Sequence, residues 1–487
     1  MMSPAHWPRR RLLQALTCSG RPDQGARARL PGPAAASLAC LFLGGVLSVG
    51  SPAAAQPTSD PGPSGRHVPA EAWRSDLERF RTEVILRDAA FSADARERAL
   101  ARLASLENRL SDATEVEVGA ELARIAALAG NAHTRVDPLR NRGVWSRLPV
   151  RLWKFSDGWR VIAARPAHAG LIGARVLAVG DLPIGEAEDA VAPLFAGNAA
   201  WSAYMAGYSL TSSEALAASG VIHADPVVLT VTIGGVEQEA TLFAEPAEGR
   251  TRPEENWWHL APEHPRTGNW RHWTPSRTPL VFQRPELGYA FARCDDGVAY
   301  LRLNRTMDQP GRAPLADWGG EVLKALERDP PSRLIIDLRF NTGGDLSKAL
   351  PFIGAIAASP LGRDSRALAV LVNGQTFSAG ITQAAWLRLH SRAAFFGEPV
   401  GDQMSFWAEG DNVVLEHSGL TARYSTGAHH YAPGPPPEEM RDRVFFTLPS
   451  PALGPDHEIA WTWSDHAAGR DPVLEAVAAG LRCSPLE

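Results

Sequence analysis

Lysine is almost absent from this chain, which has 487 residues and 49 lysines and arginines combined. The three lysines are Lys154, Lys324 and Lys348, and the other residues of this class are all arginine. A GC-rich coding sequence explains such a bias without any functional cause. The bias still has a chemical consequence, because a mechanism that needs a lysine as general base has only three candidates.

An excess of positive charge is absent as well. The net charge is −5 and the isoelectric point is about 6.3, so the chain lacks the basic footprint of proteins that bind nucleic acid or anionic membranes. We therefore expect no nucleic-acid partner. Hydrophobic residues make up 45% and charged residues 21%, which is ordinary for a globular protein with room for two or three domains.

A hydrophobic run of transmembrane length is also lacking near the N-terminus. The apolar stretch at residues 34–50 is interrupted by glycine and falls short of the ~20 residues that a spanning helix needs. Arginines precede it, and Ala53-Ala54-Ala55 supplies the small residues that a signal peptidase requires. We therefore expect residues 1–55 to be a signal peptide and the protein to be exported, periplasmic or secreted, without a stable membrane anchor.

Cysteine is scarce, with four residues in the whole chain. Cleavage of the signal peptide would leave Cys294 and Cys483 in the mature protein. These two can form a disulfide in an oxidising compartment, but a single pair of cysteines is weak evidence for one. The sequence therefore leaves their pairing open.

The residues after the signal peptide predict a tether and then helices. Residues 56–68 are rich in proline, serine and glycine, as flexible linkers are. Apolar residues recur at helical spacing at Trp73, Leu77, Phe80 and Val84 and predict one face of a first helix. Ser92 is placed to cap a second helix, and a third is expected at about residues 114–128 with Gly130 just beyond its end.

The rest of the chain changes character twice. Short alternating strands and turns run from residue 148 to about 247, and strands alternate with helices beyond residue 280, as in an α/β layer with parallel strands. Between them lies a stretch without clear period, whose tryptophans at 257, 258, 270 and 273 we interpret as packing residues. The predicted organisation is a signal peptide (1–55), a linker (56–68), a helical N-terminal part (69–147), a β-rich insert (148–247), an irregular linker (248–279) and an α/β core (280–487).

Ser378 is the first candidate for chemistry. It is expected where a hydrophobic strand turns into a helix, so backbone N–H groups and the positive end of the helix dipole point towards any ligand there. A serine hydroxyl needs a base and a stabiliser for the developing oxyanion to act as a nucleophile. The alternative is that Ser378 serves only as the N-cap of its helix.

A glycine-rich loop at residues 341–345 (NTGGD) follows another buried strand. Consecutive glycines let the backbone approach a ligand closely and leave N–H groups free for an anion. Two strand–loop–helix units in succession are typical of an active site at the carboxyl edge of a sheet. An ordinary strand-to-helix turn is the alternative.

Five segments, in this order along the chain, resemble the S41-type serine peptidases: the tail-specific or carboxyl-terminal processing peptidases and their tricorn-like relatives. The segments are residues 131–136 (NAHTRV), 333–344 (RLIIDLRFNTGG), 371–380 (LVNGQTFSAG), 394–399 (AFFGEP), and 455–456 (PD) with 469–474 (GRDPVL). Together they span about residues 131–480. Several dispersed matches are far more specific than any one of them.

The resemblance implies an α/β fold with a ClpP/crotonase-like core, a helical N-terminal part and a PDZ-like β-rich insert. It implies acyl transfer from a peptide or protein substrate to Ser378 and then to water, without a cofactor. The backbone N–H groups of Gly343 or Gly344 and of Ala379 would form the oxyanion hole. PDZ-like modules capture extended peptides by adding a strand to a sheet edge.

The general base is where this chain departs from the processing peptidases. Their serine works with a lysine shortly after the "GE" turn, whereas residues 401–404 (GDQM) contain none. The tricorn-like branch instead uses a histidine ahead of the insert, and His133 fits that role in type, local motif and chain order. An imidazole can take the serine proton at neutral pH and return it to the leaving group. The alternative is a histidine that only packs after a helix.

The third member of the catalytic set stays open. The relatives place an acid before the closing "PD" segment, but residues 444–454 contain none; the candidates nearby are Glu398, Glu409, Glu438, Glu439 and Asp442. Asp337 and Arg339 are interpreted as structural. The histidine pairs 429/430 and 259/272 lack the cysteines or clustered carboxylates of a metal site, so we expect no metal.

Three other functions are compatible with the sequence features described above. A serine hydrolase or esterase acting on non-peptide acyl groups would use the same site. A catalytically inactive peptide- or ligand-binding member would keep the fold and lose the chemistry. A crotonase-like acyl-CoA enzyme would share the oxyanion geometry, but the expected export signal argues against it.

Overall fold

The computed structural model describes residues 68–137, 145–245, 260–261 and 269–487. The predicted signal peptide and most of the predicted 56–68 linker lie outside these residues, as do Trp257, Trp258 and His259. No helix within the described residues is long and apolar enough to cross a membrane.

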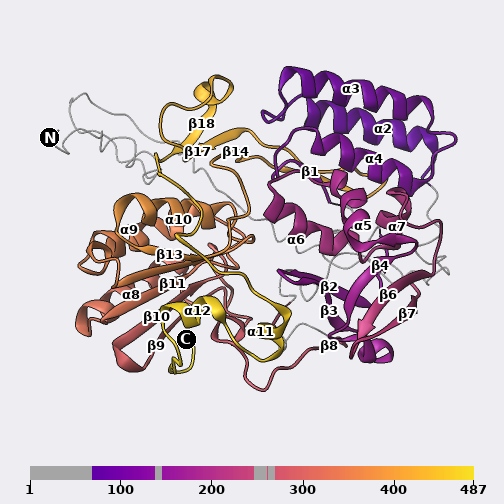
Figure 1. Ribbon diagram of the computed structural model, residues 1–487. Helices are drawn as coiled ribbons and strands as arrows, with labels where there is room; N and C mark the ends of the chain where they lie inside the picture. The colour runs from indigo at the N-terminus through magenta and orange to yellow at the C-terminus, as the bar shows by residue number, and fades with distance from the viewer. Residues whose placement is uncertain (1–67, 138–144, 246–259, 262–268) are drawn as a thin grey trace, which may run out of the picture. The chain divides into compact units, whose positions relative to one another are not determined.

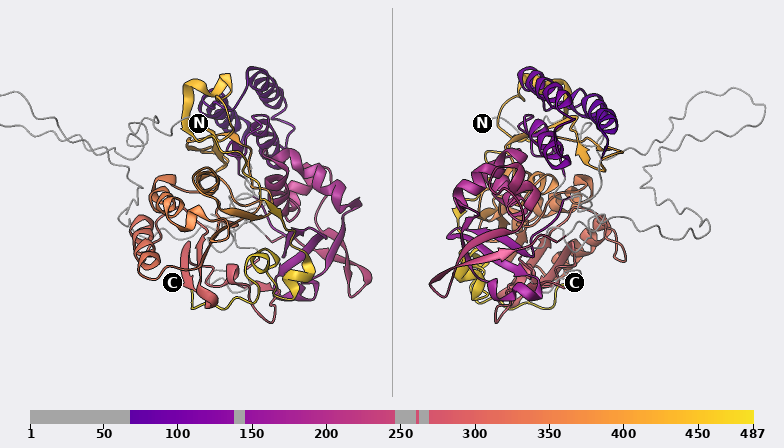
Figure 2. Two further views of the ribbon diagram at one scale, coloured as in Figure 1. Left: turned by 60° about the vertical axis from the view of Figure 1, so that its left-hand side comes forward. Right: turned by 90° about the vertical axis from the view of Figure 1, so that its right-hand side faces the viewer.

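The three predicted N-terminal helices are confirmed: α2 (Ala70–Phe80), α3 (Ala93–Asn108) and α4 (Glu115–Ala127). A π-helical turn (Arg81–Ile85) extends α2. The Ser92 side chain accepts a hydrogen bond from the first turn of α3, and Thr114 forms a capping box with Glu117 at the start of α4. The helices pack on one another and stay together in every view (Figures 1 and 2).

An antiparallel sheet follows, in the order β2-β3-β4-β6-β7. Its strands are β2 (Val150–Phe155), β3 (Gly158–Ala164), β4 (Arg175–Val179), β6 (Val227–Ile233) and β7 (Val236–Leu242), with β5 (Leu182–Pro183) beside β4. The hairpin β6–β7 closes this part of the chain. β2 lies at one edge of the sheet.

Helices also occur in this part of the chain, where short strands and turns were expected. They are α5 (Ile184–Val191), α6 (Ala199–Ser209) and α7 (Ser213–Ala218). The sequence predictions did not include α6 and α7. α6 (AAWSAYMAGYS) is apolar on most sides because it packs between β2 and the nucleophile segment, so its sequence has no 3.6-residue period.

A short strand also occurs in the predicted 248–279 linker. β8 (Arg271–His272) pairs with β3, so this described part of the linker belongs to the β-rich sheet. The tryptophans here pack as predicted: the guanidinium groups of Arg151 and Arg165 each lie 4.5 Å from the ring centre of Trp270, and Trp273 contacts Trp463.

The last part of the chain contains a six-stranded sheet in the order β19-β13-β12-β11-β10-β9. Its neighbours are parallel except for the antiparallel edge pair β9–β10. The strands are β9 (Tyr289–Arg293), β10 (Val298–Leu303), β11 (Arg333–Asp337), β12 (Leu368–Val372), β13 (Ala394–Gly397) and β19 (His457–Glu458). The predicted strand–helix alternation is therefore confirmed.

Helices cover both faces of this sheet (Figure 1). Alternate strand residues pack against α8 (Leu315–Arg328), α9 (Leu350–Ala358) and α10 (Ala379–His390) on one face. The other strand residues pack against α12 (Pro472–Val477). α11 (Trp463–Ala467) lies just before α12 in the chain.

Two small sheets join distant parts of the chain. β1 (Arg135–Val136), which begins two residues after His133, pairs with β16 (Thr421–Arg423), which pairs with β15 (Asn412–Val414). The other sheet consists of β14 (Ser405–Ala408), β17 (Gly427–His430) and β18 (Val444–Thr447). The remaining short helices are 3₁₀ turns at Pro166–Leu171, Ala192–Leu194, Leu280–Phe282, Asp295–Gly297, Leu346–Lys348, Leu361–Arg363 and Glu438–Arg443.

Cys294 and Cys483 form a disulfide, which settles the pairing that the sequence left open. The bond fastens the C-terminal tail to the end of β9, and Glu487 exchanges backbone hydrogen bonds with Phe291 in the middle of this strand. The molecule is thus a mixed α/β protein with several sheets.

Candidate active site

Ser378 is the N-cap residue of α10, directly after the turn that follows β12. Its backbone has φ 54° and ψ −122°, and its side chain makes no capping hydrogen bond to the helix. A non-glycine residue in such a conformation costs about 1–3 kcal/mol and persists only where its surroundings enforce it. An ordinary capping serine has an extended backbone and bonds the helix N–H groups. Ser378 does not have the geometry of an ordinary N-cap.

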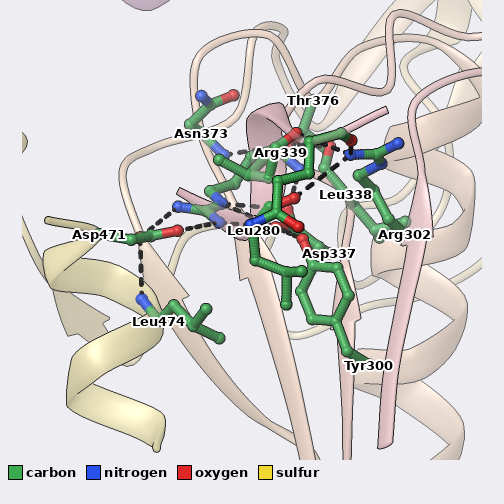
Figure 3. A network of polar contacts seen from close by, with 12 residues as sticks. Leu280, Tyr300, Arg302, Asp337, Leu338, Arg339, Asn373, Thr376, Asp471 and Leu474 are labelled. Atoms are coloured by element: carbon green, nitrogen blue, oxygen red, sulfur yellow. Dashed lines mark hydrogen bonds and ion pairs between the residues drawn. The ribbon is translucent and has the colours of Figure 1, made fainter. Parts of the chain in front are cut away.

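The turn before Ser378 is held by hydrogen bonds to the end of the neighbouring strand, β11. The Thr376 hydroxyl donates to the carbonyl oxygen of Leu338 at 2.9 Å and accepts from the Asn373 N–H at 3.1 Å (Figure 3). The N–H of Phe377 donates to the carbonyl oxygen of Asn341, also at 2.9 Å. These contacts keep the turn in place and so sustain the unusual backbone at Ser378.

A buried ionic cluster lies at the same edge of the sheet (Figure 3). The guanidinium of Arg339 binds Asp337 at 2.6 Å and Asp471, the N-cap of α12, at 2.7 Å, and the Tyr300 hydroxyl donates to Asp337. Burial would lower the pKa of Arg339, but the two carboxylates raise it well above its usual value. The cluster joins α12 to β11, and these are the contacts of structural residues, as the sequence predicts for Asp337 and Arg339.

The glycine loop lies directly against Ser378. A Cβ atom on Gly343 would come within 2.6 Å of the Ser378 Cβ, and one on Gly344 within 2.3 Å of the Thr306 carbonyl oxygen. Both glycines have positive φ, at 104° and 139°. No side chain fits at either position, so the loop backbone approaches the serine as an oxyanion hole requires.

The three predicted oxyanion donors differ in their surroundings. A Cβ on Gly343 would lie 3.4 Å from the backbone nitrogen of Ala379, so this nitrogen sits beside the serine and the loop. The N–H of Gly343 donates to the Asn341 Oδ1 at 3.0 Å. It could serve an oxyanion only if that bond opened, which favours Ala379 and Gly344 as the donors.

His133 packs against the residue that precedes Ser378. Its ring stacks on Phe377 with centroids 4.3 Å apart, and Phe406 stacks on it with centroids 5.3 Å apart. Trp201 of α6 covers the far face of Phe377, and His429 covers that of Phe406. His133 is only 5% exposed. Its imidazole is held in a column of five stacked rings, one of which, Phe377, belongs to the nucleophile turn.

A carboxylate faces His133. The Asp402 Oδ2 lies 3.6 Å from the His133 Nδ1, and both side chains are buried. Burial raises the pKa of Asp402 to about 7, although a hydrogen bond from the Gln403 N–H lowers it in part. At neutral pH this carboxyl is therefore poised between its two protonation states.

The segment that carries Asp402 is fixed to the nucleophile turn. The Gly401 N–H donates to the Thr376 carbonyl at 2.9 Å. The Asn198 amide donates to the carbonyls of Val400 at 2.7 Å and Asp402 at 3.1 Å, while its oxygen caps α6. One asparagine thereby connects α6 to the Asp402 segment.

Polar contacts also fix the segment around His133. The Asn131 amide donates to Thr134 and Ser425, and its oxygen accepts from the Trp407 N–H. The Thr134 hydroxyl donates to Asp88 at 2.6 Å. Burial raises the pKa of Asp88 to about 6, and the hydrogen bond from Thr134 lowers it in part. The histidine therefore sits in a loop with fixed neighbours on both sides.

Comparison with solved structures finds this architecture elsewhere. A CPAF mutant matches with a TM-score of 0.55 at 14% identity, over 84% of this chain and 96% of that one. CPAF complexed with lactacystin matches with 0.54 at 14% identity, over 84% and 97%. A putative S41 protease from Bacteroides fragilis matches with 0.29 at 12% identity, over 69% and 82%. The chain has an S41-type peptidase fold. No protein-family model and no curated protein sequence matches it.

At these identities the S41-type fold is shared, while activity needs evidence from the site itself. The lysines provide some of that evidence. Lys154 binds Glu188 at 2.7 Å, Lys324 binds Glu321 at 2.8 Å and Lys348 binds Asp308 at 2.6 Å. The pKa values of Lys324 and Lys348 are raised, mainly by hydrogen bonds to these carboxylates, so both amines stay protonated.

The carboxylates suggested by the sequence lie elsewhere in this S41-type fold. Glu409 contacts His429 at 2.9 Å, Glu398 lies near Trp461, and Glu438, Glu439 and Asp442 are exposed. Asp402, which the sequence reasoning missed, faces His133 instead. The available signal was its position, shortly after the "GEP" turn, where processing peptidases of this fold have their lysine.

His429 and His430 make ordinary hydrogen bonds. His430 bonds Ser405 through its Nδ1 at 2.8 Å, and His429 bonds Tyr431 through its Nδ1 at 2.9 Å. Among the residues that the structure describes, no group of three His, Cys, Asp or Glu side chains is arranged to hold a metal ion.

Proposed function

We propose that this chain is an exported serine peptidase that hydrolyses peptide bonds through an acyl-enzyme on Ser378, with His133 as base in place of a lysine. The observation that carries the proposal is the arrangement around the nucleophile turn. The turn presents a strained serine beside a glycine loop, and it stacks directly on a histidine that faces a buried carboxylate.

The chemistry follows from these positions. Because Nδ1 of His133 faces Asp402, Nε2 is the nitrogen that takes the proton as the Ser378 Oγ attacks the substrate carbonyl carbon. The backbone N–H of Ala379, with that of Gly344, binds the resulting oxyanion. His133 then protonates the leaving amine, the C–N bond breaks, and water repeats the sequence on the acyl-enzyme.

Asp402 orients the base in this proposal. As a carboxylate it accepts the Nδ1–H of His133 and stabilises the imidazolium that forms. The three lysines bind carboxylates outside this arrangement, which supports histidine over lysine.

Two further parts of the proposal rest on the fold. The sheet β2–β7 serves as a PDZ-like insert that captures extended peptides, and the six-stranded sheet with its helices serves as a ClpP/crotonase-like core. The Cys294–Cys483 disulfide supports export, because such bonds persist in oxidising compartments.

Labelling with a fluorophosphonate probe tests the proposal. We expect wild type to label, Ser378→Ala not to label, and His133→Ala to label at least about 10²-fold more slowly, because a positioned base contributes that much or more. Lys348→Met is the matched control and should label at the wild-type rate. Lactacystin, complexed with CPAF in one matching structure, gives a second probe.

The outcomes separate the candidate functions. Folded wild-type protein that stays unlabelled would contradict the hydrolase and favour a non-catalytic binding protein. Labelling that is lost in Lys348→Met but kept in His133→Ala would identify Lys348 as the base instead of His133. Labelling with hydrolysis of esters but not of peptides would indicate an esterase, and peptides with free or blocked C-termini would distinguish carboxyl-terminal processing from endopeptidase activity.

A further inference from the structure

A cavity of about 350 Å³ lies beside the nucleophile turn. One wall is the edge strand β2 with residues 152–155, a second is α6, and a third is the turn itself at residues 373–375. Its lining is dominated by aromatic rings: Trp153, Phe155, Trp159, Tyr204, Tyr208, Phe340 and Trp461. Cavities of this size and lining hold apolar ligands whose orientation is set by a few polar groups.

The cavity is close to the proposed nucleophile. Gln375 lines it and is three residues before Ser378, so their Cα atoms are at most about 11 Å apart, which is about three residues of extended peptide. The α6 wall touches the same turn, because a Cβ on Gly374 would lie 3.1 Å from the Ala200 Cβ and Trp201 stacks on Phe377. The cavity is therefore within reach of a peptide bound at Ser378.

Two polar groups in the lining lack a hydrogen-bond partner within the described residues: the Gln375 amide and the Trp461 indole N–H. Gln375 is 2% exposed, and neither its amide oxygen nor its amide nitrogen has a hydrogen-bond partner within the described part of the chain. Burying an unpaired amide is unfavourable, so such groups are uncommon in folded proteins. A peptide group, with one donor and one acceptor, would satisfy both atoms.

The charged groups of the cavity are already compensated. Lys154 binds the Glu188 carboxylate at 2.7 and 2.8 Å. Burial raises the pKa of Glu398, while the Trp461 backbone and Arg339 lower it in part. Neither group requires an ion of opposite charge, and the two polar groups that lack a partner, the Gln375 amide and the Trp461 indole N–H, are neutral.

From this arrangement we propose that the cavity is a specificity pocket for a large aromatic side chain of the peptide, within three residues of the scissile bond. The Gln375 amide holds the adjoining peptide group. The inference rests on the proposed peptidase function and names its substrate class as peptides with an uncharged aromatic residue near the cleavage site.

Cleavage of a peptide library tests the pocket, with aromatic, small, acidic and basic residues at each of the three positions on either side of the scissile bond. We expect wild type to prefer Phe, Tyr or Trp at one position. Ala203→Trp, which fills the cavity from α6, should lower kcat/KM for these peptides by about tenfold or more and bring them to the level of alanine peptides. Ala199→Trp, on the same helix but exposed and outside the cavity, should keep the wild-type profile.

Gln375→Leu separates recognition from structure. The variant should raise KM for aromatic peptides by about tenfold, because the peptide loses its hydrogen bonds. It should leave the unfolding midpoint unchanged or higher, because an unpaired buried amide is removed. A purely structural glutamine would show the reverse, with a lower midpoint and an unchanged KM.

Fluorophosphonate labelling distinguishes failure of the pocket from failure of the proposed function. Normal labelling of Ala203→Trp with an unchanged peptide profile would overturn the pocket and leave the nucleophile intact. If wild type does not label, calorimetry of Ser378→Ala with a Phe-containing and an Ala-containing peptide still tests the pocket. Equal affinities, or an equal loss of both in Ala203→Trp, would overturn it.

Discussion

At the scale of single residues, the site depends on contacts that fix side chains which are otherwise unremarkable in the sequence. Ser378 differs from any other serine before a helix through its backbone, which Thr376 and Phe377 hold by hydrogen bonds to β11 and the loop after it. His133 differs from a packed histidine through Asp402, whose carboxyl is buried beside it. We therefore place the strongest test of the mechanism at Asp402.

We expect Asp402→Asn to slow fluorophosphonate labelling by about 10²-fold or more, because an amide cannot stabilise the imidazolium. The wild-type rate should rise with pH around a midpoint near 7, the pKa to which burial raises Asp402. Asp402→Asn should lose that dependence. Asp308→Asn, a partly exposed carboxylate that pairs with Lys348, is the control and should keep the wild-type rate and profile.

Asp402→Asn should affect stability in the opposite direction from the labelling rate. The pKa of Asp402 is raised from 3.8 to about 7 on folding, so between these values the folded chain keeps a proton that the unfolded chain has lost. Asp402 therefore raises the free energy of unfolding below about pH 4, and this contribution is lost as the pH rises to about 7. Above pH 7, Asp402→Asn should be as stable as wild type or more stable in urea unfolding. A strongly destabilised variant would show that the carboxylate is needed for folding instead.

At the scale of secondary-structure elements, periodic and capped segments were predictable and buried or paired ones were not. The face of α2, the Ser92 cap of α3 and the extent of α4 follow from local signals, and each is confirmed. α6 gave no signal, because its apolar residues face both β2 and the nucleophile turn. β8 gave none either, because two residues become a strand only through pairing with β3.

Asn198 connects two of these elements, because it caps α6 with its oxygen and binds the Asp402 segment with its amide. Asn198→Ala should lower the free energy of unfolding by about 1 kcal/mol for the cap and also slow labelling. Asn198→Ser should recover the cap, since serine caps helices well, but not the labelling rate, since its side chain is too short to replace the amide at both carbonyls. Urea unfolding and labelling of the two variants decide it. Equal labelling rates in wild type and both variants would show that Asn198 acts only as the cap of α6.

At the scale of the whole molecule, the order of motifs predicted the fold better than any single motif predicted the site. Segments at residues 131–136, 333–344 and 371–380 resemble S41-type peptidases, and the fold is of that type. The resemblance could not supply Asp402, because the relatives place their acid elsewhere in the chain. It could not supply the cavity either, because β2, α6 and the nucleophile turn meet only through the fold.

Removal of the disulfide tests how much the outer edge of the six-stranded sheet contributes to the stability of the molecule. Cys294 and Cys483 are 189 residues apart in sequence, so their bond restricts a long loop of the unfolded chain. The double substitution to serine should lower the free energy of unfolding by about 2–5 kcal/mol, and a reductant should reproduce the shift in wild type. Labelling at 25 °C should persist, because Ser378, His133 and Asp402 lie on other elements. An unchanged denaturation midpoint would show that the hydrogen bonds between the C-terminal tail and β9 hold this edge without the covalent bond.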